Sequence, residues 1–141
     1  MRCHQLRGQI KRYFDNDEIE YIDFGTNSEE SVNYPEEAQL VALSVQTGEC
    51  EKGVLICGTG LGMSIVANKF KGIRCAVCSN ETTAKYSRLH NDSNVLALGA
   101  SEVSVSEAIS ILKVWLAIEF EGGRHEERLK LIENIENENF K

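Results

Sequence analysis

Short apolar runs alternate with helix-like segments along the chain, and this order limits the possible folds more than any other feature. Residues 53–58, GVLICG, form a continuous apolar run typical of a strand covered on both faces. Between such runs, apolar residues recur every three or four positions, as in helices that pack on a core. In the last of these helix-like segments, Ile132 and Ile135 are expected to face the core. Strands that alternate with helices predict a parallel sheet with helices on both sides. We therefore expect a three-layer α/β/α, Rossmann-like domain. The expected strands are residues 19–25, 53–58, 73–79 and 94–100. The expected helices are residues 6–14, 35–47, 81–90, 104–120 and 122–136, with one more that begins at about residue 62.

The first strand of that pattern is missing from the sequence. A doubly wound domain normally starts with a central strand, whereas this chain starts with MRCHQ and enters a helix by Leu6. At 141 residues the chain fits one domain, residues 1–141, which can bury about two-thirds of its unfolded surface. In such sheets ligands bind beyond the carboxyl ends of the strands. Because Cys57, Ser79 and Gly99 fall at those ends, we expect the chemistry there.

Charge and hydropathy exclude several classes of function. The formal net charge of −7 disfavours nucleic acid or an anionic membrane as the main partner. No apolar run reaches the roughly 18 residues of a membrane span and no signal peptide is evident, so we expect a cytoplasmic protein. Five cysteines, an odd number, favour free thiols over a disulfide framework. Cys75 and Cys78 lie three apart on a predicted strand and so point to opposite faces, which disfavours a shared metal or redox site.

The turn after the run at 53–57 is the strongest candidate for a catalytic site, because it reads Cys-Gly-Thr-Gly-Leu-Gly. Gly58, Gly60 and Gly62 let the backbone approach a ligand closely, and their N–H groups with the following helix start favour an anion. The same field favours the thiolate form of Cys57, which suits acyl chemistry or proton abstraction beside a carbonyl. From spacing alone, a tight turn beside a small apolar cysteine is an equal alternative, since complete dinucleotide and phosphate-loop motifs are absent.

Two further groups of polar residues follow along the chain. His90 and Asn91 end a predicted helix just before a strand, although a lone histidine is more often structural than catalytic. Arg124 and Arg128 follow a pair of glycines and are four residues apart, so a helix places both on one face, where they can bind a phosphate. Two glutamates between them allow the alternative of a solvated charged helix.

Five segments, taken together, resemble one known family. They are, in order, DFGTNSEESVNYP, GVLICGTGLGMSIVANK, GIRCAV, HNDSNVLALGA and FEGGRHEERL. Their order and spacing closely resemble the ribose-5-phosphate isomerase B and galactose-6-phosphate isomerase family from Leu6 onward, and the ribose-phosphate branch in particular. The resemblance implies aldose–ketose isomerisation of a phosphorylated sugar through an enediolate, such as ribose 5-phosphate to ribulose 5-phosphate in the pentose phosphate pathway. It also implies no metal or organic cofactor, and a homodimer or homotetramer with active sites completed across a subunit interface.

The resemblance implies a role for the glycine turn. The family's base, which moves the proton between C1 and C2, matches Cys57. Thr59 and the surrounding turn match the group that stabilises the enediolate oxygen. Some family members instead carry a glutamate base at the position of Met63, and because methionine takes no proton this chain resembles the cysteine type.

The resemblance also implies roles outside that turn. The residue matching His90 assists opening of the furanose ring, and the residue matching Asn91 contacts the sugar. The residue matching Tyr34 lies near the substrate. The phosphate is held at the positions of Arg124 and Arg128.

The start of the chain departs from the family. Relatives begin with a strand and a Gly-x-Asp-His-Ala-Gly-like turn that helps bind and open the sugar ring, and Met1 falls near the position of that histidine. A start assigned too far downstream, a truncation and a natural variant each account for this. Two functions stay open as a result. One is an isomerase, favoured by the joint presence of Cys57, Thr59, His90 and the two arginines, and the other is a non-catalytic sugar-phosphate-binding or partner subunit.

Overall fold

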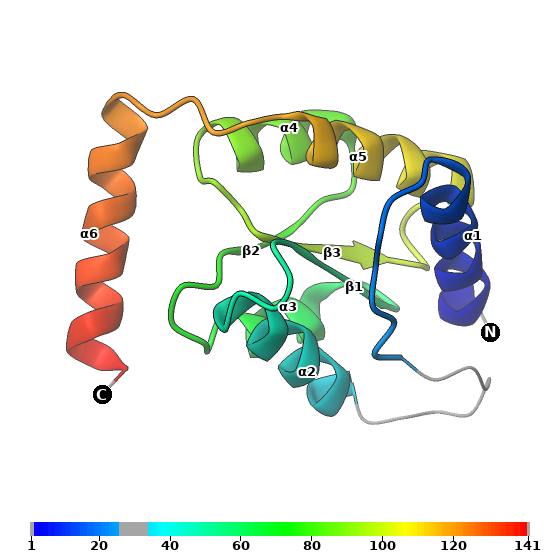
Figure 1. The fold of residues 1–141 in the computed structure, drawn as a ribbon, viewed down its shortest axis with the longest axis horizontal. Coiled ribbons are helices and arrows are strands. Elements are labelled where there is room, and N and C mark those ends of the chain that lie inside the picture. The colour runs from blue at the N-terminus through cyan, green and yellow to red at the C-terminus, as the bar shows by residue number, and fades with distance from the viewer. Residues whose placement is uncertain (1, 26–33, 141) are drawn as a thin grey trace.

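The computed structural model describes residues 2–25 and 34–140, without the side chains of Arg2, His4 and Tyr34. Figure 1 shows its helices and strands. In chain order these are α1 (Arg2–Asn16), α2 (Tyr34–Gln46), β1 (Gly53–Cys57), α3 (Leu61–Ala67), β2 (Cys75–Val77), α4 (Glu81–Leu89), β3 (Val95–Gly99), α5 (Val105–Ala117) and α6 (Arg124–Asn139). None of the helices in the described residues has the length and apolar character needed to cross a membrane.

The three strands form one parallel sheet in the order β1-β3-β2. β3 lies in the centre, where Val95 aligns with Gly53 of β1 and with Cys75 of β2. All five residues of β3 are buried, as expected for a strand covered on both faces. The carboxyl ends of the strands lie on the same side, called here the carboxyl end of the sheet, where Cys57 aligns with Gly99. The strands begin on the opposite side, at Gly53 and Val95, which is the amino end of the sheet.

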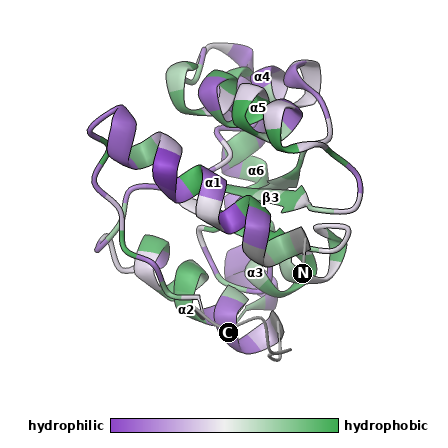
Figure 2. Cartoon of the chain, turned by 90° about the vertical axis from the view of Figure 1, so that its right-hand side faces the viewer, coloured by the Kyte–Doolittle hydropathy of each residue, from purple (hydrophilic) through white to green (hydrophobic). Residues whose placement is uncertain are grey.

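Helices cover both faces of the sheet, which confirms the predicted three-layer α/β/α architecture. Side chains alternate across β3, because successive residues of a strand point to opposite faces. Leu96 and Leu98 therefore lie in a core shared with α1, α4 and α5, whereas Val95 and Ala97 lie in a second core shared with α2 and α3. Figure 2 shows the hydrophobic β3 between these layers. The two cores hold the sheet, and hence both of its ends, in place.

The strand predicted at 19–25 is not part of the sheet. These residues form no ladder with β1 in the described structure. The central first strand of a doubly wound domain, which the sequence analysis predicts to be missing, is absent there too. Asp23 instead ties the segment to α1 through ion pairs with Lys11 at 3.0 Å and Arg7 at 3.8 Å. A cavity of about 890 Å³ is lined by both this segment and β1. The prediction is wrong because a strand needs a neighbour for its backbone groups, and none lies beside this segment among the described residues.

The last two helices also differ from the predictions. The helix predicted over 104–120 ends at Ala117, and Ile118 has extended backbone angles. Ile132 and Ile135 of α6, predicted to face the core, are 41% and 59% exposed. In Figure 1, α6 stands at the side of the molecule rather than over a face of the sheet. The helical period of the apolar residues was therefore predicted correctly, but the side chains lie on an open surface of this chain.

Candidate active site

Cys57 lies at the carboxyl end of β1, where the chain turns into α3. Its Sγ accepts a hydrogen bond from the Gly60 N–H at 3.1 Å. Gly60 has a left-handed φ of 83°, which glycine adopts without strain. A Cβ on Gly60 would also lie only 3.2 Å from the backbone carbon of Leu98. The turn thus uses glycine at position 60 to bring an N–H group to the sulfur.

The other side of the turn is fastened to the segment that follows β3. Ser101 donates to the Gly58 carbonyl from its backbone N–H at 2.9 Å and also from its hydroxyl group. At Gly99 a Cβ would lie 2.6 Å from the carbonyl oxygen of Thr59, so glycine is needed for this close approach. The sequence places Gly99 at this end of the sheet but does not reveal its packing role, which depends on a contact between distant segments.

Thr59 presents its hydroxyl group at the tip of this turn. The residue is exposed, and its Oγ1 accepts the Leu61 N–H at 3.2 Å. Because the oxygen is the acceptor in that bond, the hydroxyl proton is left to donate to a ligand. Gly58 is exposed beside it, and Gly62 is partly buried in the first turn of α3. The turn therefore combines a thiol, a hydroxyl donor and accessible backbone at one place.

The surroundings of the cysteines set Cys57 apart. All five are free thiols, as predicted. Burial raises the pKa of Cys75 to about 12 and also raises the pKa of Cys78. Cys75 packs against the α2–α3 core and Cys78 lies in the other core, which confirms that they face opposite sides of the sheet. These two thiols resist ionisation near pH 7. What distinguishes Cys57 is the Gly60 N–H that donates to its sulfur.

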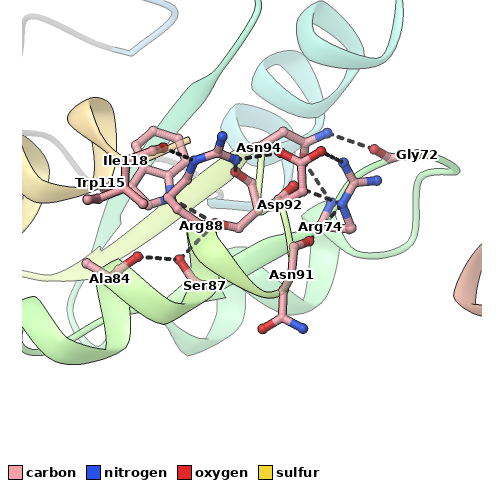
Figure 3. Close-up of polar contacts among 11 residues, drawn as sticks. Gly72, Arg74, Ala84, Ser87, Arg88, Asn91, Asp92, Asn94, Trp115 and Ile118 are labelled. Carbon is pink, nitrogen blue, oxygen red and sulfur yellow. Dashed lines mark hydrogen bonds and ion pairs between the residues drawn. The ribbon is translucent and has the colours of Figure 1, made fainter. Parts of the chain in front are cut away.

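His90 and Asn91 lie at the amino end of the sheet. Helix α4 begins after β2 and runs back along the sheet, so its C-cap, His90, comes just before β3. The Asn91 carbonyl accepts a hydrogen bond from Arg74 Nε at 3.1 Å. Figure 3 shows the Asn91 side chain pointing away from the neighbouring polar contacts, and the residue is exposed. Both residues are thus at the opposite end of the sheet from Cys57.

A buried polar network holds the chain next to His90 (Figure 3). Arg88, which is 6% exposed, donates to the Asp92 carboxylate at 2.8 Å and to the Ser93 carbonyl at 2.6 Å. Trp115 Nε1 donates to the Ser93 hydroxyl at 2.8 Å. Arg74 adds a longer ion pair to Asp92 at 3.4 Å. A buried charge is costly without its partners, so this network holds in place the connection between α4 and β3, which contains His90.

Three residues that the sequence analysis did not select surround His90. The His125 ring stacks on the His90 ring, with centroids 4.0 Å apart and planes 13° apart. The Tyr86 ring lies 4.9 Å from the His90 centroid, and Glu121 Oε2 lies 3.8 Å from His90 Nε2. Two features of the sequence could have indicated these neighbours. His125 is next to Arg124, and Tyr86 precedes His90 by four residues, or about one turn of α4.

The geometry of this cluster does not fit a metal ion. Donor atoms of His90, Glu121 and His125 all lie within 4.8 Å of one another. A histidine nitrogen binds a metal along its lone pair, in the ring plane, at about 2.0–2.1 Å. The two rings are nearly parallel, with centroids 4.0 Å apart, so an ion that close to both nitrogens would lie outside both planes. Burial, followed by the nearby His90 and Arg124 charges, lowers the pKa of His125, which is therefore neutral at pH 7.

Arg124 and Arg128 begin α6 and share one face of it. Gly122 and Gly123, with φ of 75° and 60°, turn the chain into this helix. Both arginines are exposed, and neither forms an ion pair with another residue of the described chain. Two such guanidinium groups at a helix N-terminus suit a phosphate group.

The structure divides the predicted site residues between the two ends of the sheet. The carboxyl end carries Cys57, Gly58, Thr59, Gly60 and Gly62, and the amino end carries His90, Asn91, Arg124 and Arg128. The Tyr34 side chain lies outside the described residues. At about 3.3 Å per residue, β1 alone separates the two ends by roughly 13 Å. One copy of the chain therefore does not bring Cys57 and His90 together.

Comparisons with known proteins agree with this architecture. The family model described as Ribose/Galactose Isomerase matches residues 2–132. Ribose-5-phosphate isomerase B of Escherichia coli is 48% identical over 131 residues, which are 93% of this chain and 88% of that protein. The solved ribose-5-phosphate isomerase B of Clostridium thermocellum superposes with a TM-score of 0.94 at 48% identity, over 96% of this chain and 91% of that one.

A second solved structure has a sugar phosphate bound. It is ribose-5-phosphate isomerase B of Mycoplasma genitalium with ribulose-5-phosphate, and it superposes with a TM-score of 0.92 at 37% identity, over 96% of this chain and 90% of that one. The family model thus covers most of the chain, and relatives above 30% identity cover it nearly end to end. The chain therefore belongs to the ribose/galactose isomerase family, and it is a sugar-phosphate isomerase.

Proposed function

We propose that this protein interconverts ribose 5-phosphate and ribulose 5-phosphate, with Cys57 as the base. The observation that carries the proposal is the 3.1 Å hydrogen bond from Gly60 N–H to Cys57 Sγ, within a turn open to solvent. An N–H donor at the sulfur stabilises negative charge on it, as does the start of α3. Burial raises the pKa of Cys75 and Cys78 and so favours their thiol form, whereas Cys57 ends its strand beside the Gly60 N–H.

The reaction then proceeds by proton transfers alone. The Cys57 thiolate takes the proton from C2 of the open-chain aldose, the C–H electron pair forms the C1–C2 double bond, and O1 gains a proton. O2 then loses its proton, which through solvent makes up for the one that O1 gained, and C1 recovers the proton from Cys57, which gives the ketose. Thr59 donates its hydroxyl proton to the enediolate oxygen as charge develops there. Atoms and electrons balance without an oxidant or reductant.

The amino end of the sheet supplies substrate binding in this proposal. Arg124 and Arg128 hold the phosphate group, His90 assists opening of the furanose ring, and Asn91 contacts the sugar. The arginines suit this role because both are exposed and neither has a carboxylate partner in the described chain. The ribulose-5-phosphate bound to the Mycoplasma genitalium relative supports a five-carbon substrate.

Because the two ends lie apart, we infer that each active site uses two copies of the chain. Cys57 and Thr59 come from one copy, and His90 and the arginines come from the other, in a homodimer or homotetramer. Exposed apolar side chains suited to such an interface are Leu61 and Ile65 on α3, and Leu131, Ile132 and Ile135 on α6. Their exposure ranges from 41% to 63%, which is high for aliphatic residues of a single folded chain.

The cellular setting follows from the chemistry. Free thiols at all five cysteines suit the reducing cytoplasm. Interconversion of ribose 5-phosphate and ribulose 5-phosphate is a step of the pentose phosphate pathway. The reaction as written uses no metal or organic cofactor.

One observation favours a second candidate function. Residues 19–25 and β1 do not pair in the described structure, and the cavity of about 890 Å³ is lined by both. A sugar-phosphate isomerase subunit with an open β1 edge could instead bind sugar phosphates, or assist a partner subunit, with little turnover of its own.

An assay on this chain separates the two functions. Purified protein is given ribose 5-phosphate, ribulose 5-phosphate formation is followed, and binding is measured in parallel by calorimetry. Turnover that is lost in Cys57→Ala supports the isomerase. Binding without turnover supports the non-catalytic subunit, and absence of both contradicts the two proposals together.

A further inference from the structure

His90 lacks a hydrogen bond to hold its ring in the described part of the chain. Its only ion-pair partner among the described residues is Glu121, whose Oε2 lies 3.8 Å from His90 Nε2, too far for a hydrogen bond. The residue is the C-cap of α4 and is partly exposed. Something else must fix the ring, because proton transfer requires the acid or base to lie within hydrogen-bond reach of its target.

Two neighbouring rings provide that restraint. His125 stacks nearly parallel to His90 at 4.0 Å, and Tyr86 meets the same ring at 4.9 Å and 41°. These contacts limit rotation of the His90 ring, since turning it out of plane would break the stack. Tyr86 itself is 44% exposed, whereas His125 is 5% exposed. His125 is therefore the firmer of the two supports.

The backbone explains why His125 is buried at the start of a helix. Gly122 and Gly123 both have positive φ, and the His125 N–H donates to the Gly122 carbonyl at 3.2 Å. This tight turn directs His125 inward while Arg124 remains exposed. One short segment thus places a phosphate-binding candidate and a support for His90 side by side.

The charges around the pair favour a neutral His125. The groups that act on His125 are Glu121 from the segment between α5 and α6, Arg124 and Arg128 from α6, and His90 from α4, while Tyr86 from α4 meets the His90 ring. Burial and the neighbouring positive charges lower the pKa of His125, against a smaller opposite effect of Glu121. A neutral ring can stack on His90 whether or not His90 carries a proton, because it adds no repelling charge.

We propose that His125 is a positioning residue for His90, and that its buried, stacked ring fixes the plane in which His90 meets the sugar. The proposal rests on the proposed isomerase function for its effect on turnover. His125 does not itself exchange a proton with the substrate. It acts through His90, so the flat ring is needed and the ring nitrogens are not.

Two substitutions test this proposal. His125→Phe keeps a flat ring and removes the nitrogens, whereas His125→Ala removes the ring. Glu126→Ala, in the same helical turn and exposed, is the matched control. For each purified variant we would measure kcat and KM with ribose 5-phosphate, the melting temperature, and the NMR chemical shifts of the His90 ring protons.

His125→Ala should lower kcat about ten- to a hundredfold, as expected for a misplaced catalytic group. KM should change much less, because the arginines remain. His125→Phe should restore most of kcat, and Glu126→Ala should leave kcat unchanged. The His90 ring protons should show an upfield ring-current shift that is lost in His125→Ala and kept in His125→Phe.

Three results would overturn the proposal. The first is an unchanged kcat in His125→Ala. The second is a kcat in His125→Phe as low as in His125→Ala, which would mean that the imidazole nitrogens are needed. The third is a His90 ring-proton shift that is the same in His125→Ala as in wild type. An inactive wild type would refute the proposed function, and the chemical shifts would still decide whether His125 positions the His90 ring.

Discussion

The two ends of the sheet hold their candidate site residues by different means. At the carboxyl end, Cys57 is fixed by the backbone, through the β1–β3 ladder and a turn whose glycines let segments touch. At the amino end, His90 depends on side chains, namely the His125 stack and the network of Arg88. Backbone geometry survives replacement of a side chain, whereas a side-chain cluster changes when one member is lost. We therefore expect changes at the carboxyl end to affect chemistry alone, and changes at the amino end to affect binding and orientation.

The largest expected effect belongs to the carboxyl end. Cys57→Ala should abolish measurable turnover, a loss of at least about 10²–10⁴-fold for an acid–base group, while the melting temperature stays near wild type. Cys57→Ser should be nearly as inactive, because an alcohol ionises far less readily than a thiol at neutral pH. Cys50→Ser, which also changes a partly exposed free cysteine, is the control and should keep full activity. Substantial turnover by Cys57→Ser would rule Cys57 out as the base.

The next effect concerns the edge of β1 that faces residues 19–25. Each buried backbone group left unpaired there costs about 1–3 kcal/mol, and an open edge promotes aggregation. A version of the chain with an apolar strand and an Asp-His turn joined ahead of α1 should therefore melt higher, aggregate less and turn over faster. Differential scanning calorimetry and the isomerase assay, run on both proteins side by side, check this. Equal melting temperatures and equal turnover would show that the open edge is of no consequence.

A smaller effect is expected from the arginines at the amino end. Arg124→Ala and Arg128→Ala should each remove a charge-assisted phosphate contact worth about 1.5–3 kcal/mol, and so weaken substrate binding roughly ten- to a hundredfold. The loss should appear in KM more than in kcat. Inhibition by inorganic phosphate provides a second measurement, because phosphate should inhibit the variants less than wild type. Equal inhibition of all three proteins would contradict the phosphate assignment.

The smallest effect is a pH dependence of stability from His125. Its pKa is lowered on folding, so below the ordinary value of about 6.5 the unfolded chain binds a proton that the folded chain resists. This contribution to stability is complete above pH 6.5 and is lost as the pH falls towards the folded pKa. The melting temperature should therefore fall less between pH 7.5 and 5.5 in His125→Phe than in wild type. An identical fall in both proteins would argue against a lowered pKa of His125.

The layers and the glycine turn could be predicted from the sequence because their signals are local. The apolar run of β1, the helical period of α2 and the three glycines after Cys57 each depend on near neighbours in the chain. The absence of residues 19–25 from the sheet could not be predicted in this way, because an extended segment becomes a strand only beside a partner. The contact of His125 with His90 could not be predicted for a similar reason, since His90 lies 35 residues earlier and meets His125 only in the folded chain.

The separation of the two ends also lay beyond the sequence. Cys57, His90 and Arg124 were each selected as site residues, and a resemblance implied that sites are shared between subunits. The register of β1 on β3 places Cys57 at one end, and the course of α4 places His90 at the other. The direction of each element along the sheet thus decides which residues can meet within one chain.

Subunit complementation tests the shared active site most directly. Cys57→Ala and the double variant Arg124→Ala/Arg128→Ala are each close to inactive alone in our account, since each lacks one half of every site. When equal amounts are unfolded together and refolded, half of the dimers should be mixed, and each mixed dimer should contain one intact site, which gives about a quarter of wild-type activity. Activity no greater than the sum of the two separate variants would contradict a site built from the carboxyl end of one copy and the amino end of another.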